Sequence, residues 1–178
     1  MSEEKNLEEI KKFWPKGAPD INSVPKYINK YKQELIVIKY GGNVLIDRNI
    51  FNNFIEDIRV LNKLGLSIIV VHGGGPRIER KLKKENIKTN FINGLRVTDG
   101  KVISIVEDVL IDFNKDIVDS LIKKGAQAIS ITSKHNNIIN VVPDNKELGF
   151  VGIPESINIE FLKNVINKKR NLLFQLYV

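Results

Sequence analysis

The sequence lacks cysteine, and its only two histidines, His72 and His135, stand far apart. Disulfide bonds and thiolate-bound metals are therefore excluded, and we expect no metal held by protein side chains alone. Long apolar runs are also missing, because stretches such as residues 66–71 are much shorter than the roughly 20 residues of a membrane helix. The acidic start, with Glu3 and Glu4, is unlike a secretory signal. We expect a cytoplasmic protein without a membrane partner.

Charge of one sign is in moderate excess, since 28 Lys and Arg against 21 Asp and Glu give a formal net charge of +7. Such an excess favours an anionic ligand or a nucleic acid. The basic residues are nevertheless spread among acidic ones, and the chain has neither a basic strand studded with aromatic residues nor a recognition-helix motif. We interpret most of this charge as solvated surface and expect no nucleic-acid partner.

The length of 178 residues and the 42% hydrophobic content favour one domain of the α/β class. Alternating strand and helix patterns predict a mainly parallel sheet across residues 24–178. The predicted strands, whose Ile and Val runs suit a sheet covered on both faces, are residues 35–39, 67–72 and 128–132. The predicted helices are residues 49–64, 76–86, 102–124 and 156–169, with a loop at 91–99 and a hairpin-like pair at 138–142 and 149–153.

Residues 1–23 are interpreted as an amphipathic leader helix and a linker. The helical face over residues 3–14 carries Leu7, Ile10, Phe13 and Trp14, and the prolines and glycine that follow end the pattern. This apolar stripe either folds back on the domain or docks on another subunit.

Two predicted strands end in glycine turns. Lys39 leads into Gly41 and Gly42, and the second strand leads into residues 73–75, all glycine, followed by Pro76. Open α/β sheets bind ligands at the carboxyl ends of their strands, where bare N–H groups and a helix start suit an anion. A tight turn alone also explains a lysine before two glycines. The spacing of a P-loop or a dinucleotide fingerprint is absent.

Arg96 follows a turn at Asn93 and Gly94, and Thr98 or Asp99 is suited to cap the next helix. A guanidinium fork suits a substrate carboxylate, whereas the alternative is a surface arginine paired with a nearby acid. We interpret His72 as a structural residue at a strand end, because no carboxylate is placed in the sequence to orient it as a base.

Taken in order, residues 39–43, 72–76, 94–99 and 148–152 resemble the motifs of the acetylglutamate kinases, members of the amino acid kinase family. The similarity spans residues 24–169. It implies a three-layer α/β sandwich with a mainly parallel central sheet. It also implies phosphorylation of the side-chain carboxylate of N-acetyl-L-glutamate in arginine biosynthesis, with ATP and Mg²⁺.

By position, Lys39 corresponds to the family's lysine that stabilises the transferring phosphoryl group. The resemblance also implies phosphoryl-binding residues and substrate-binding residues, respectively Gly41, Gly42 and Gly73, and Gly74, Gly75 and Arg96. Such transfer needs positioning and charge neutralisation more than a covalent intermediate. We therefore expect Lys39, Gly74 and Arg96 to converge on one pocket.

The chain also departs from the family pattern. The family's nucleotide lobe, with a second lysine and an Asn-x-x-Ala-Asp stretch, has no counterpart, and a Ser-Gly-Lys-Asp stretch is replaced at residues 133–135. Residues 171–178 are expected to form an unpaired apolar strand that exposes a sheet edge. We expect little or no turnover by this chain alone.

Two alternatives stay open. One is a related kinase for another acyl acceptor, of the aminoadipate type. The other is a truncated, non-catalytic module for binding or assembly. The resemblance further implies a homo-oligomer, with the leader helix linking dimers into a hexamer.

Overall fold

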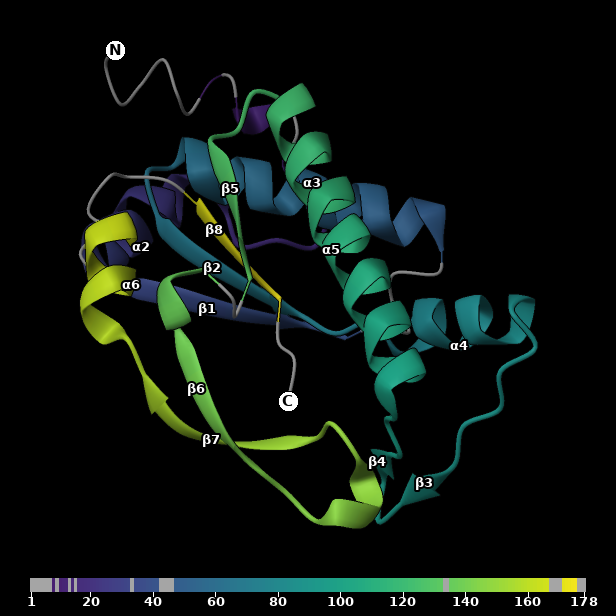
Figure 1. Cartoon of the computed structure of the whole chain (residues 1–178). Helices are drawn as coiled ribbons and strands as arrows, with labels where there is room; N and C mark the ends of the chain where they lie inside the picture. The colour runs from purple at the N-terminus through teal and green to yellow at the C-terminus, as the bar shows by residue number, and fades with distance from the viewer. Residues whose placement is uncertain are drawn as a thin grey trace.

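The computed structural model describes residues 8, 10–12, 14, 16–32, 34–41, 47–132, 135–166 and 171–175. The elements in chain order (Figure 1) are η1 Ile21–Ser23, α2 Val24–Tyr31, β1 Leu35–Tyr40, α3 Arg48–Lys63, β2 Ser67–His72, α4 Gly75–Lys84, β3 Phe91–Ile92, β4 Leu95–Arg96, α5 Gly100–Lys123, β5 Ala128–Thr132, η3 His135–Asn137, β6 Ile139–Pro143, η4 Lys146–Leu148, β7 Gly152–Ile157, α6 Ile159–Ile166 and β8 Asn171–Gln175. The expected α/β class is confirmed.

Four strands form a parallel sheet in the order β1-β2-β8-β5. Their last residues lie in register, because Tyr40 pairs with His72 and Gln175 pairs with both His72 and Thr132. The chain therefore leaves β1 and β2 at the same edge of the sheet.

Helices pack on both faces of this sheet. On one face, Ile68 and Val70 of β2 join apolar residues of α3 and α5 in one core cluster. On the other face, Ile69 belongs to a second cluster that includes residues of α6. Successive side chains of a strand point to opposite faces, so the Ile-Ile-Val-Val run of β2 contributes side chains to both clusters. The expectation that residues 67–72 are covered on both faces is confirmed.

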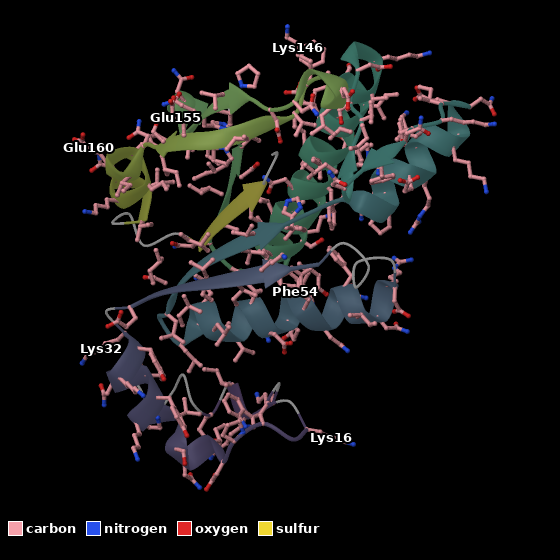
Figure 2. The ribbon with its side chains drawn as sticks, turned by 90° about the horizontal axis from the view of Figure 1, so that it is seen from below. Lys16, Lys32, Phe54, Lys146, Glu155 and Glu160 are labelled. Atoms are coloured by element: carbon pink, nitrogen blue, oxygen red, sulfur yellow. The ribbon has the colours of Figure 1, made fainter. Side chains whose placement is uncertain are left out.

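Helix α3 shows how local sequence produces this packing. The Asp47 carboxylate accepts hydrogen bonds from the backbone N–H groups of Asn49 at 2.7 Å and Ile50 at 3.1 Å, which caps the helix start. Phe54, on the side of α3 that faces the sheet (Figure 2), stacks on Tyr40 of β1 with ring centroids 3.6 Å apart. Burying an aromatic side chain of this kind contributes about 2 kcal/mol relative to leaving it in water.

Strand β1 is not buried as predicted. It is an edge strand, and its residues alternate between exposed and half-buried, with Val37 60% exposed. Ile38 and Tyr40 pack against the α3 and α5 cluster, whereas no described segment covers Val37 on the opposite face. The sequence run alone cannot distinguish an edge strand from a central one.

The prediction that the carboxyl-terminal residues form an unpaired strand at a sheet edge was wrong for the described residues 171–175. Strand β8, Asn171–Gln175, pairs on one side with β2 and on the other with β5, so it is an internal strand. Parallel pairing on both sides satisfies its backbone groups. The edges of the described sheet are β1 and β5 instead.

The hairpin-like pair is confirmed, with the first strand shifted by one residue and the second placed at Gly152–Ile157. β6 pairs antiparallel with β7, from Pro143 opposite Gly152 to Ile139 opposite Ile157. The predicted helix start at Ser156 was wrong, since β7 continues through Ile157 and α6 begins at Ile159. Cross-strand pairing with β6, from Pro143 to Ile139, holds these residues extended, and the local sequence does not indicate it.

The described part of the leader makes contacts within this chain. Ile10 is helical and buried, and the Trp14 indole N–H donates a hydrogen bond to the Pro19 carbonyl at 2.9 Å. Leu7 and Phe13 lie outside the described residues. A linking role for the leader in a hexamer stays a prediction. Helix α2, with Pro25 in its first turn, was not predicted from the sequence.

Candidate functional site

The glycine turn after β2 forms the centre of the candidate site. Gly74 is the N-cap residue of α4, and its carbonyl accepts a hydrogen bond from the Ile78 N–H at 2.9 Å. An added Cβ at Gly74 would lie closer than 3.0 Å to a Leu110 methyl carbon of α5, a separation that real Cβ atoms essentially never show. Gly73 and Gly75 have open space at the same position. Only the middle glycine is therefore required by packing.

Arg96 is presented by a short hairpin within the segment predicted as a loop. β3 and β4 pair through a two-residue turn in which Asn93 has φ +50° and Gly94 φ +83°. Positive φ at both central residues is the type I′ pattern that Asn-Gly favours. The pairing places Arg96 opposite Phe91, and the guanidinium carbon lies 4.7 Å from the centroid of that ring.

Two polar contacts hold the Arg96 guanidinium. Nη2 donates to a Glu79 carboxylate oxygen at 2.6 Å, and Nη1 donates to the Thr89 hydroxyl at 2.6 Å. The Arg96 side chain is 13% exposed and the Glu79 side chain 55% exposed. The alternative that Arg96 is a surface arginine paired with a nearby acid is therefore half right: Arg96 pairs with Glu79, but its side chain is largely buried.

The tip of the β6–β7 hairpin closes over the start of α5 (Figure 1). The Thr98 N–H donates to the Leu148 carbonyl at 2.9 Å, and the Phe150 N–H donates to the Thr98 carbonyl at 2.7 Å. Gly149 has φ +72°, and an added Cβ would lie closer than 3.0 Å to the Thr98 carbonyl oxygen. Asp99 caps α5, because its carboxylate accepts from the N–H groups of Lys101 and Val102 at 2.9 and 2.8 Å.

These elements enclose a cavity of about 210 Å³. Its polar lining residues are Gly74, Arg96 and Thr98, and its apolar ones are Ile78, Leu95, Ile103, Val106, Leu110, Phe150 and Val151. Two of the three residues expected to converge, Gly74 and Arg96, therefore line one cavity. A guanidinium at an otherwise apolar wall suits a small ligand that carries a carboxylate.

The apolar wall of this cavity was not assigned by sequence reasoning. Phe150 and Val151 lie in the segment 148–152, whose similarity to the family was noted without a role. The glycine at 149 was the available signal, because it permits the turn that brings Phe150 to Thr98.

Lys39 does not line this cavity. It is exposed, at the end of β1 beside Val71, and therefore at the same sheet edge as the glycine turn after β2. It alternates with Ile38 and Tyr40, which pack toward α3, so its Cβ points to the opposite face. Gly41 follows at the same edge, and Gly42 lies outside the described residues, as do Ser133 and Lys134.

His72 is buried behind the glycine turn. Its Nδ1 lies 3.2 Å from the Gly73 carbonyl oxygen, its ring packs edge-on against Phe113 with centroids 4.8 Å apart, and Nε2 has no hydrogen-bond partner within the described part of the chain. Burial lowers the pKa of His72, and the nearby Arg77 charge lowers it further, against an opposing hydrogen bond to Gly73. A buried neutral imidazole agrees with the structural role inferred from the sequence.

Metal-ligand clusters and membrane-spanning helices are both absent from the described segments. Over these residues, no three His, Asp or Glu side chains gather closely enough to hold a metal ion. None of the helices described is long and apolar enough to cross a membrane.

The fold is an α/β domain with a cavity at the carboxyl edge of its parallel sheet, and that cavity is lined by one guanidinium and mostly apolar side chains. The chain belongs to the amino acid kinase family, which matches residues 34–174. It is a homologue of acetylglutamate kinase and covers roughly the amino-terminal half of that enzyme. The resemblance inferred from the motifs is thereby confirmed.

Two relatives illustrate the match. The chain is 56% identical over 163 residues to an acetylglutamate kinase of Pelagibacter ubique, covering 92% of this chain and 57% of that protein. It is 40% identical over 148 residues to an acetylglutamate kinase of Campylobacter curvus, covering 82% of this chain and 52% of that protein. The chain thus spans about half the length of the curated relatives it matches.

Solved structures support the fold alone. An N-acetylglutamate synthase from Neisseria gonorrhoeae, in complex with coenzyme A and N-acetyl-glutamate, matches with a TM-score of 0.72 at 17% identity, over 86% of this chain and 36% of that one. The smu.665 protein of Streptococcus mutans matches with a TM-score of 0.67 at 24% identity, over 79% of this chain and 58% of that one.

Proposed function

We propose that this chain is the N-acetyl-L-glutamate-binding half of an acetylglutamate kinase that works in arginine biosynthesis. The observation that carries the proposal is the cavity shared by Gly74 and Arg96. Its polar residues stand at an otherwise apolar wall, which suits a ligand with carboxylates and a small acyl group. The relatives named acetylglutamate kinase give this chemistry its substrate.

In the proposed binding mode, Arg96 binds the carboxylate that does not react. The backbone N–H groups of Gly74 and Gly75 face the reacting carboxylate at the start of α4, where the helix dipole favours negative charge. Gly41, Gly42 and Gly73 approach the transferring phosphoryl group, and Lys39 supplies its positive charge there. Lys39 has no ion pair or hydrogen bond among the described residues, so it is available for such a role.

In the proposed reaction of the whole enzyme, a side-chain carboxylate oxygen of the substrate forms a bond to the terminal phosphorus of ATP, and ADP leaves. The residues of this chain would position the acceptor and neutralise charge, which is the main contribution of a protein to phosphoryl transfer. Mg²⁺ would supply further neutralisation of the phosphate oxygens. Since the described residues offer no acidic cluster of their own for a metal, the ion fits this half only as a partner of the nucleotide.

The proposal also includes the three-layer sandwich of the family as the architecture of the whole enzyme, assembled as a homo-oligomer. Support comes from the helices on both faces of the described sheet and from the structural neighbours.

Isothermal titration of N-acetyl-L-glutamate into the 178-residue chain tests the proposal. We expect saturable heat that Arg96→Ala weakens at least tenfold, because a hydrogen-bonded charge contributes about 1.5–3 kcal/mol. Arg80→Ala is the matched control: Arg80 is exposed on the same helix as the glycine turn, lines a different surface cleft and should leave the affinity unchanged.

Other outcomes would redirect the assignment. Absence of heat from a folded, oligomeric chain would contradict the substrate-binding role and favour an assembly module. Tighter binding of N-acetyl-L-2-aminoadipate than of N-acetyl-L-glutamate would assign the cavity to the longer acyl acceptor.

A further inference from the structure

Arg96 is held from outside the cavity that it lines. Glu79, Thr89 and Phe91 contact its guanidinium, and none of the three lines the cavity. A guanidinium has five N–H donors, and the two hydrogen bonds use one N–H on each terminal nitrogen. The remaining donors are available to a ligand carboxylate in the cavity, while the other contacts fix the orientation of the group.

The Glu79 contact joins the two halves of the proposed substrate site. Glu79 belongs to α4, the helix that begins directly after the glycine turn, and Arg96 belongs to the β3–β4 hairpin. The ion pair between them therefore fixes the separation between the guanidinium and the N–H groups of residues 74 and 75. In the proposed binding mode these groups bind the two carboxylates of one ligand, so their separation sets the ligand length that fits.

We propose that Glu79 is a positioning residue that aims Arg96 and sets the length selectivity of the site for N-acylated dicarboxylates. This inference rests on the proposed function. Two effects of Glu79 oppose each other, since its negative charge weakens the attraction of Arg96 for an anion while its hydrogen bond orders the guanidinium. The Glu79 side chain is 55% exposed, so solvent screens its charge, whereas the buried guanidinium gains order directly. The ordering of the Arg96 guanidinium is the larger of the two effects, so removal of the Glu79 carboxylate lowers the affinity of the site for its ligand.

Titrations with three ligands of increasing length test this role: N-acetyl-L-aspartate, N-acetyl-L-glutamate and N-acetyl-L-2-aminoadipate. Glu79→Gln should weaken the binding of N-acetyl-L-glutamate about threefold to fivefold, the range for a partly exposed ion pair. It should also narrow the affinity differences among the three ligands, an effect that a general loss of stability would not produce. Glu85→Gln, which breaks the Lys81–Glu85 ion pair on the same helix, is the matched control and should change neither quantity.

Unchanged or tighter binding by Glu79→Gln, or an equal loss in Glu85→Gln, would overturn the positioning role. If the folded wild-type chain binds none of the three ligands, the proposed function is wrong. Hydrogen exchange then tests separately whether Glu79 orders the β3–β4 hairpin that carries Arg96. The Val97 N–H donates to the Asn90 carbonyl at 2.9 Å across the base of the β3–β4 hairpin. Its exchange should accelerate in Glu79→Gln and not in Glu85→Gln, and equal rates would refute the role of Glu79.

Discussion

Replacing Gly74 by alanine should destabilise the chain, although alanine is normally a better residue for an ordered backbone. Gly74 has a negative φ of −145°, so it does not lie in the left-handed region that disfavours a side chain. The added Cβ would instead meet a methyl carbon of Leu110 closer than 3.0 Å, with the Leu110 Cγ at 3.4 Å and the Ile78 Cδ1 at 3.6 Å. Leu110 is buried in the α4 and α5 cluster, so its methyl can yield only toward the cavity that Leu110 also lines, where it would take up space for a ligand.

Two terms set the magnitude. Forcing an extra carbon into a packed core costs about 1–3 kcal/mol. A glycine-to-alanine change also lowers the conformational entropy of the unfolded chain, which stabilises the folded state by about 0.4–1 kcal/mol. Taking the middle of both ranges, the net loss is about 1.3 kcal/mol, which lowers Tm by roughly 3–5 °C for a chain of this size.

Thermal and urea unfolding followed by circular dichroism measure the effect. Gly73→Ala and Gly75→Ala are the matched controls, because an added Cβ at either position meets no atom within 4 Å, and they should leave stability unchanged or raise it. In a Leu110→Ala background the Gly74→Ala penalty should disappear, since the clashing methyl is gone. Equal behaviour of the three single glycine variants would refute the steric argument.

Two further predictions concern the hairpin tip and the buried histidine. Gly149→Ala should cost more stability than Gly94→Ala in urea unfolding, because both have positive φ but only the Cβ at 149 meets the Thr98 carbonyl; similar costs would contradict the packing at the tip. Burial lowers the pKa of His72 below its ordinary 6.5, so the unfolded state binds the proton more readily, and stability is full above about pH 6.5 and falls as the pH drops below it. His72→Gln should reduce this loss between about pH 7 and about pH 5. A pH dependence that is unaltered in His72→Gln would contradict its burial as a neutral base.

Features fixed by neighbouring residues could be predicted from the sequence. The glycine turn follows β2 as expected, and Asp99 caps α5, because a strand run, a tight turn and a capping carboxylate each act over a few residues. Two of the predicted site residues, Gly74 and Arg96, line the cavity. Their roles could be predicted because each motif contains the group that would bind an anion. The Asn-Gly turn before Arg96 also contained the signal for the unpredicted hairpin.

Features fixed by long-range pairing could not be predicted in this way. The insertion of β8 between β2 and β5 and the exposure of Val37 on β1 depend on strand order, which no local pattern encodes. The pairing of Arg96 with Glu79, and the apolar wall that includes Phe150, join segments that are distant in the chain. Lys39 was expected to share the pocket, but its face of the sheet is decided by alternation along an edge strand.

The proposed function places N-acetyl-L-glutamate in the cavity between α4, α5 and the two hairpins. A titration of the ¹⁵N-labelled chain with this ligand, followed by amide chemical shifts, tests it residue by residue. We predict saturable shifts at Gly74, Arg96 and Phe150, which line the cavity, with little change at Arg80 and Lys84 in the outer cleft. Saturable shifts confined to the outer cleft, or none from a folded chain at high ligand concentration, would contradict the assignment.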